Sequence, residues 1–381
     1  MKKLLFVLPA LGIGGVQKVL VTLANRLVRK GFDGTILTYR EPDELKAELD
    51  PRVRFRYKKP NEHFGNKIRY IRYKFYDTGM WEKRASAKQF YRYYVGSEKY
   101  DAEIAFFHSD ALKIVSGSTN KKSVKIAWVH CDFSKNHGTH DNFRSKEEFI
   151  DAYKKFDNIV CVSKATADAF RETVTDTDKI RVIHNILPVD EILKKSKETP
   201  EKKINKSAFH IVSVARYSDR EKGQLRLIDA AARLRADGED VSLALIGAGK
   251  DEKLLRDKIE ACGAKSFITL ADGGLNPYPY IRESDLLVCS SYYEGYNLTV
   301  AEAIILGVPV LSTDCAGPKE ILGGGEYGMI VENSADGLYQ GLKKLISSPA
   351  LLDGYRKKAV ERKPFFDEEK LLGQFTEMLN D

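Results

Sequence analysis

The chain has 381 residues, more than a single hydrophobic core usually serves, so we expect two domains of ordinary size. Its composition, 43% hydrophobic and 30% charged, is that of a soluble globular protein, and it contains no run of about 18 apolar residues that could span a bilayer. The five cysteines are odd in number, widely spaced and without a C-x-x-C pair, which argues against a disulfide framework or a zinc site and favours a reducing cytoplasm.

The first half of the chain alternates short apolar runs with helical patterns. It begins with a strand at 4–8, a glycine loop at 12–15 and a helix at 16–30, and the next strand follows at 35–39. Pro9 interrupts the first apolar run, so we interpret that run as a buried strand rather than as part of a signal peptide. Further strand candidates lie at 103–107, 125–129, 158–162 and 180–183. Such alternation is typical of β-α-β units in a parallel sheet.

The glycine loop after the first strand has two interpretations. Gly14 and Gly15 precede the helix, where backbone N–H groups can approach a phosphate and the helix N-terminus favours negative charge. The loop lacks the third glycine of the dinucleotide-binding fingerprint, and strand-to-helix turns also use glycine for steric reasons. Gly14 and Gly15 are therefore candidate contacts to a phosphorylated ligand, and the purely steric alternative stays open.

Residues 52–94 concentrate the positive charge of the chain. They hold thirteen Lys and Arg residues, three acidic residues and twelve aromatic residues, while the net charge of the whole chain is +8. This combination is typical of a surface that lies on anionic lipid headgroups. We expect this segment to hold a cytoplasmic protein on the inner face of the cell membrane. A plain basic surface is the alternative, and nucleic acid is a competing partner that we do not expect.

The α/β pattern stops and then resumes. Residues 187–207 are polar, rich in Lys and Glu and contain two prolines, so we expect a linker there. Strand candidates of the second series lie at 211–214, 242–246, 268–270, 286–289 and 308–311. The sequence therefore predicts an α/β fold with two doubly wound, Rossmann-like domains, 1–186 and 208–363, that face a central cleft.

Two cations follow the first strand of the second domain. Arg216 and Lys222 come after the strand at 211–214, and Gly223 follows Lys222 at the start of a helix. In doubly wound folds the carboxyl ends of the strands border the ligand crevice, and a diphosphate needs paired cations because its negative charges are closely spaced. Arg216 and Lys222 are therefore candidate diphosphate ligands, with solvated surface charge as the alternative.

The segment 293–303 carries the most specific pattern. Glu294 lies in a loop after a strand, and Glu302 lies on a helix that begins near Leu298, where free backbone N–H groups can face a phosphate. Glu302 has apolar neighbours, and an uncompensated carboxylate is costly in such a setting. We therefore expect Glu302 to accept hydrogen bonds from the hydroxyls of a ribose, and Glu294 to reach toward a transferred sugar.

Glu294 and Glu302, within the sequence EGYNLTVAEA, resemble the E-x7-E signature of the retaining GT-B glycosyltransferases of family 4. The resemblance runs almost end to end. Other family positions are matched by the glycine loop and helix at 11–27, His130, Arg216 and Lys222. The glutamate pair with the Gly-x-Pro-Val that follows it is a specific signal, whereas the glycine loop is not.

The resemblance implies a retaining, metal-independent hexosyltransferase without a cofactor, whose donor substrate is a nucleoside-diphosphate sugar, by preference a UDP-sugar. Arg216 and Lys222 would neutralise the donor diphosphate as it departs. Glu294 would contact the sugar, and His130 would lie near it and position it. The predicted catalytic residues are His130, Glu294, Arg216 and Lys222. The predicted donor-binding residues are Gly14, Gly15, Arg216, Lys222, Glu294, Tyr296, Asn297, Leu298, Thr299 and Glu302.

The second domain carries the predicted donor residues, so we expect the first domain to bind the acceptor. A lipid-linked saccharide such as a polyprenyl-diphosphate intermediate, or a surface-polysaccharide saccharide, would suit the positive charge and the membrane surface expected of residues 52–94. The last segment, 364–381, would form a helix that packs back on the first domain. Two alternatives stay open: a GT-B enzyme that epimerises nucleotide sugars, and a nicotinamide-dependent oxidoreductase, for which the third glycine of the fingerprint is missing.

Overall fold

The computed structural model describes residues 1–58, 85–135, 142–272, 274 and 276–379. The chain forms two compact units, one made of residues 1–186 with 369–381 and the other of residues 187–368. Most of the basic segment 52–94, namely residues 59–84, lies outside the described residues, so the predicted membrane surface does too.

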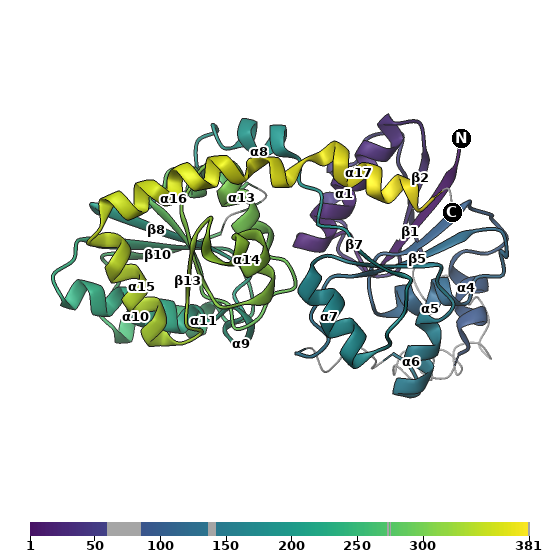
Figure 1. Ribbon diagram of the computed structural model, residues 1–381, viewed down its shortest axis with the longest axis horizontal. Helices are drawn as coiled ribbons and strands as arrows, with labels where there is room; N and C mark the ends of the chain where they lie inside the picture. The colour runs from purple at the N-terminus through teal and green to yellow at the C-terminus, as the bar shows by residue number, and fades with distance from the viewer. Residues whose placement is uncertain (59–84, 136–141, 273, 275, 380–381) are drawn as a thin grey trace, which may run out of the picture. The chain divides into compact units, whose positions relative to one another are not determined.

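The first unit is built on a seven-stranded sheet in the order β3-β2-β1-β4-β5-β6-β7, in which every pairing is parallel (Figure 1). Its strands are β1 Lys3–Leu8, β2 Asp33–Thr38, β3 Arg54–Tyr57, β4 Ala102–Ala105, β5 Val124–Val129, β6 Asn158–Cys161 and β7 Ile180–Val182. Its helices are α1 Gly15–Arg29, α4 Ala87–Tyr94, α5 Asp110–Ser116, α6 Lys146–Tyr153 and α7 Lys164–Thr173, with a 3-10 turn at Glu44–Glu48.

Both faces of the first sheet are covered by helices, which explains its continuous apolar strands. Along β1, Leu5 and Val7 point into a core that includes residues of α4, α5 and α6. Phe6, between them, points to the opposite face, because side chains alternate across a strand. All three are fully buried. The strand order changes direction at β1, which lies between β2 and β4 in the sheet. Doubly wound folds bind ligands at the carboxyl ends of the strands at such a switch point.

The second unit repeats the plan with a six-stranded parallel sheet in the order β10-β9-β8-β11-β12-β13 (Figure 1). Its strands are β8 Phe209–Val214, β9 Val241–Ile246, β10 Ile268–Ala271, β11 Leu286–Cys289, β12 Val310–Thr313 and β13 Met329–Val331. Its helices are α8 Val189–Lys195, α9 Asp219–Lys222, α10 Gln224–Ala236, α11 Glu252–Ala261, α12 Tyr278–Arg282, α13 Leu298–Leu306, α14 Ala316–Ile321, α15 Ala335–Ile346 and α16 Pro349–Arg362. The predicted α/β fold class with two doubly wound domains is confirmed.

The segment 187–207, expected as a linker, is part of the second unit. It contains α8, whose Ile192 is fully buried. Asn276 donates to the Lys195 carbonyl at 3.0 Å, and the Lys202 amide donates to the Tyr280 hydroxyl at 2.8 Å. The Lys/Glu-rich composition of this segment therefore reflects the solvated side of a packed helix rather than a free connection.

The C-terminal helix α17, Glu368–Glu377, packs within the first unit from Glu369 onward. Phe375 is fully buried there, with its ring centroid 6.2 Å from that of Phe6 and 5.6 Å from that of Trp128. The last described residues thus complete the core on one face of the first sheet.

Because Phe375 fills this core, we expect Phe375→Ala to lower the free energy of unfolding of the first unit by about 3–5 kcal/mol, as large-to-small core substitutions do. The measurement is urea unfolding followed by circular dichroism. The matched control is Val360→Ala on α16, where the side chain is more than half exposed and a change within about 0.5 kcal/mol is expected. Equal effects of the two substitutions would contradict this placement of α17.

Candidate active site

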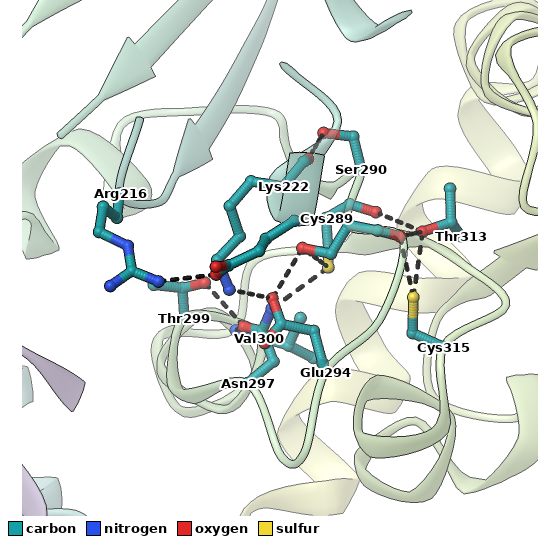
Figure 2. A network of polar contacts seen from close by, with 12 residues as sticks. Arg216, Lys222, Cys289, Ser290, Glu294, Asn297, Thr299, Val300, Thr313 and Cys315 are labelled. Carbon is teal, nitrogen blue, oxygen red and sulfur yellow. Dashed lines mark hydrogen bonds and ion pairs between the residues drawn. The ribbon is translucent and has the colours of Figure 1, made fainter. Parts of the chain in front are cut away.

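The predicted polar residues of the second unit gather at the carboxyl ends of β8 and β11. These two strands are neighbours in the sheet, and sequence order reverses between them, because β9 flanks β8 on its other side. Residues 215–223 follow β8 and residues 290–297 follow β11. Figure 2 shows side chains from both loops in one connected polar network. The arrangement is that of the ligand crevice of doubly wound folds.

A tight turn after β8 presents the two cations. The Arg216 guanidinium, about two-thirds exposed, donates to Glu221 Oε2 at 2.6 Å. Gly223 joins α9 to α10 with φ of +60°, and a Cβ there would lie 2.4 Å from the Ser290 carbonyl oxygen. Only glycine allows this close approach of the β8 and β11 loops, so Gly223 brings Lys222 beside the β11 loop.

Lys222 and Glu294 form the ion pair at the centre of the site. Lys222 Nζ lies 2.7 Å from Glu294 Oε1, and the two side chains are only 18% and 11% exposed. Burial by itself lowers the pKa of Lys222, but the charge of Glu294 and its hydrogen bond outweigh burial and raise that pKa above the usual value. The ammonium is therefore charged at neutral pH, and two of its three protons remain for other acceptors.

The loop that carries Glu294 is held from beneath by a buried arginine. Arg226 on α10 donates to the carbonyl oxygens of Ser290, at 2.6 Å, and Ser291, at 3.0 Å, and to Asn333 Oδ1 at 2.7 Å. Its guanidinium carbon lies 3.9 Å from the ring centroid of Tyr292. These bonds immobilise the backbone between β11 and Glu294.

Helix α13 directs its N-terminus into the site. Asn297 is its N-cap and accepts a hydrogen bond from the Val300 amide at 3.0 Å. The amides of Leu298 and Thr299 belong to the first turn, where a helix offers them no acceptor, so they suit an anionic ligand. The Tyr296 side chain is 3% exposed and belongs to the core, so only its backbone can reach a ligand. Glu302, four residues into the helix, is 5% exposed.

The remaining predicted residues lie in the first unit. Gly14 is the N-cap of α1 in extended backbone, and Gly15 is the first residue of that helix. A Cβ on Gly12 would lie 2.9 Å from Pro42 Cγ, which gives this part of the loop a steric reason for glycine. No acidic residue occupies the first turn of α1, so its free amides keep their positive character.

His130 follows β5 and is a neutral imidazole. Burial, and next the charge of His108, lower its pKa to about 3, and a hydrogen bond to the Phe106 backbone only partly opposes them. Its ring centroid lies 4.9 Å from that of Phe106, and its plane is within 8° of that of Trp128. Nε2 is buried and finds no hydrogen-bond partner among the described residues. The side chain can therefore accept a hydrogen bond but cannot act as a cation.

Residues that the sequence analysis did not single out complete the network of the second unit. They are Glu221, Arg226, Cys289, Ser290, Ser291, Thr313, Cys315 and Asn333. The serine pair at 290–291, which one residue separates from the segment 293–303, was a signal in the sequence that could have found part of this network. Arg226 had none, because its partners lie 64 to 107 residues away.

The described part of the chain contains no group of three or more His, Cys, Asp or Glu side chains arranged to hold a metal ion. In the same residues, no helix is long and apolar enough to cross a membrane.

Two Rossmann-like units, one of them with cations and a helix N-terminus at its switch point, give the chain the GT-B fold. The model of "Glycosyl transferases group 1" matches residues 194–362, and that of "Glycosyltransferase Family 4" matches residues 13–191. The chain belongs to the family 4 type of GT-B glycosyltransferases, as its sequence predicted.

One curated relative is the N-acetylgalactosamine-N,N'-diacetylbacillosaminyl-diphospho-undecaprenol 4-alpha-N-acetylgalactosaminyltransferase of Campylobacter jejuni. It is 29% identical over 224 residues, which are 58% of this chain and 59% of that protein. An uncharacterised glycosyltransferase of Methanocaldococcus jannaschii is also 29% identical, over 51% of this chain and 48% of its own length. The chain thus spans about half to three fifths of these relatives.

Solved structures share the fold over the whole chain. A mutant of Staphylococcus aureus TarM in complex with fondaparinux, alpha-GlcNAc-glycerol and UDP superimposes with a TM-score of 0.77 at 14% identity, covering 100% of both chains. At this identity the likeness concerns the fold alone.

The low pKa of His130 predicts a measurable effect of acid on stability. Between pH 6.5 and about pH 4 the unfolded chain takes up a proton at this residue and the folded chain does not, so this histidine lowers stability as the pH falls. We expect His130→Gln to lose less of its melting temperature than the wild type on going from about pH 7 to about pH 5, by calorimetry. Parallel pH profiles for the two proteins would contradict a buried neutral His130.

Proposed function

We propose that the protein transfers a hexosyl group, with retention of anomeric configuration and without a metal or cofactor, from a UDP-sugar to a lipid-linked or surface-polysaccharide saccharide at the inner face of the cell membrane. The observation that carries the proposal is the Lys222–Glu294 pair beside the N-terminus of α13, with Arg216 at the same carboxyl edge of the sheet. A diphosphate and a sugar hydroxyl are the ligands that this combination suits.

The charges of the site support a diphosphate leaving group. As the bond to the sugar breaks, negative charge grows on the departing nucleoside diphosphate, and fixed cations and helix amides stabilise it. The Lys222 ammonium has three N–H donors, so it can donate to a phosphate while its ion pair with Glu294 stays intact. In the Arg216–Glu221 pair the arginine is about two-thirds and the glutamate one-third exposed, and pairs in contact with solvent contribute little, so a diphosphate can displace Glu221 at low cost.

The retaining outcome is proposed without a covalent intermediate. In the mechanism that we favour, the diphosphate leaves and the acceptor attacks on the same face of the sugar, and a diphosphate oxygen takes up the proton of the acceptor hydroxyl. His130, neutral and buried, would position the sugar rather than act as a nucleophile. Proton NMR of the anomeric coupling in the product checks the retention.

The identity of the donor is supported by relatives of the fold. The TarM complex contains UDP, and crystal structures of Anabaena HepE, with a TM-score of 0.73–0.75, contain UDP, UDP with glucose, or UDP-glucose. For the acceptor, the name of the Campylobacter jejuni relative specifies a saccharide on diphospho-undecaprenol. These substrates are assigned to the present chain by analogy.

The donor site is tested by calorimetric titration with UDP, GDP and ADP in the absence of added metal. We expect selective binding of UDP, weakened about tenfold or more by Lys222→Ala and less by Arg216→Ala, because charge-assisted hydrogen bonds to phosphate are lost. The control is Lys253→Ala, which removes an exposed cation paired with Asp257 on α11. UDP affinities that the first two substitutions leave unchanged would exclude this site.

The membrane role of residues 52–94 is tested by sedimentation with vesicles. Their charge predicts binding to vesicles that contain anionic lipid, little binding to neutral vesicles, and release at high salt. A variant with Arg69, Arg72 and Lys74 changed to Gln should bind several-fold less. Binding that is indifferent to lipid charge would count against this part of the proposal.

A further inference from the structure

The backbone of Asn297 has a conformation that favours glycine. Its φ is 76° and its ψ is 94°, and among the described residues it is the only residue other than glycine with positive φ. Asparagine tolerates positive φ better than most residues, but the conformation still carries strain. Strain of this kind persists only where the surrounding contacts impose it, and the Asn297 side chain makes such contacts.

Every polar atom of the Asn297 side chain is used, and each end has a different target (Figure 2). Oδ1 accepts from the Val300 amide at 3.0 Å and from Thr299 Oγ1 at 2.8 Å. Nδ2 donates to Glu294 Oε1 at 3.0 Å and to Cys289 Sγ at 3.2 Å. The amide orientation follows from these partners, because the Val300 N–H can only donate.

Glu294 is oriented by three donors on a single oxygen. Oε1 accepts from Lys222 Nζ at 2.7 Å, from Ser291 Oγ at 2.7 Å and from Asn297 Nδ2 at 3.0 Å. Within the described residues no bond goes to Oε2, so that oxygen is the one available to a ligand. The carboxylate is thus fixed before any ligand arrives.

We propose that Asn297 is a positioning residue for Glu294 and for the N-terminus of α13 together. One short side chain links the carboxylate that would meet the donor sugar to the helix turn that would meet its phosphate, and it sets the distance between them. A glycine would relieve the backbone strain but supply neither link. This inference rests on the proposed function for what Glu294 contacts, while the clamp itself rests on the geometry.

The test is Asn297→Asp. Aspartate keeps the helix cap through one oxygen but sets its other oxygen against Glu294 Oε1, where two ionised carboxylates repel and one shared proton removes the repulsion. The pKa of the pair is then raised in the folded state, so its contribution to stability is present at low pH and is lost as the pH rises. We expect the melting temperature of the variant to match the wild type near pH 5 and to fall below it near pH 8.

Adding Glu294→Gln should abolish this pH dependence, because the amide of Gln can donate to Asp. The cap control is Ser334→Ala, which removes the N-cap of α15 and should lower stability equally at both pH values. A pH dependence that persists with Gln at position 294, or a variant that follows the wild-type profile at every pH, would overturn the clamp. These measurements need no substrate, so their failure is distinct from failure to bind or turn over a UDP-sugar.

Turnover tests the positioning role. With UDP-sugar as donor, we expect Asn297→Asp to transfer or hydrolyse sugar about tenfold more slowly than the wild type near pH 8 and to recover most of the rate near pH 6. Ser291→Ala, which removes one donor to Oε1 without touching the cap, should lower turnover with little change in UDP affinity. Normal rates in both variants would show that Glu294 needs no such support.

Discussion

The Lys222–Glu294 ion pair is the interaction on which the rest of the second unit's site depends. Removing two charges from water costs more than their attraction returns unless additional hydrogen bonds satisfy them. Those bonds come from Ser291 and Asn297, three residues before and three residues after Glu294. A pair that is more than four-fifths buried therefore requires a loop that returns on itself around the carboxylate.

That loop in turn requires a rigid foundation. Its backbone carbonyls point inward, and buried carbonyl oxygens need donors. Arg226 supplies them at Ser290 and Ser291, while Thr313 donates to Ser291 at 2.6 Å from the neighbouring strand. Gly223 brings the β8 loop close enough for the Ser290 hydroxyl to donate to the Lys222 carbonyl at 2.8 Å. Lys222 and Glu294 are thus connected through backbone as well as through charge.

Much of the fold could be predicted because parallel strands buried on both faces read as continuous apolar runs. β3 was missed because it is an edge strand of sequence RFRY, with two arginines that bind Glu98. β13, whose sequence is MIV, was missed as well. Nothing in the sequence indicated that the segment 187–207 packs within the second unit, because composition records which side of a segment faces water and not whether its other side is packed.

The residue types of the site were predictable, but their pairings were not. Arg216, Lys222 and Glu294 could be found from their places after strands, yet nothing local in the sequence reveals that Lys222 pairs with a residue 72 positions away. Asn297 was predicted as a donor-binding residue. The role of its side chain depends on a positive φ that turns it back toward Glu294, and no pattern of residue types encodes that angle.

Both predicted diphosphate ligands, Arg216 and Lys222, are already paired with carboxylates, and this lowers the affinity that a bound diphosphate can gain from them. Two unpaired cations would repel each other, and the full attraction of an anion to both would appear as binding affinity. Here a diphosphate must compete with Glu221 for Arg216 and share Lys222 with Glu294, so only the difference between the two arrangements appears as affinity. If the site binds a diphosphate as proposed, simultaneous contacts to Arg216, Lys222 and the first turn of α13 would offset this exchange better than a contact to one cation alone.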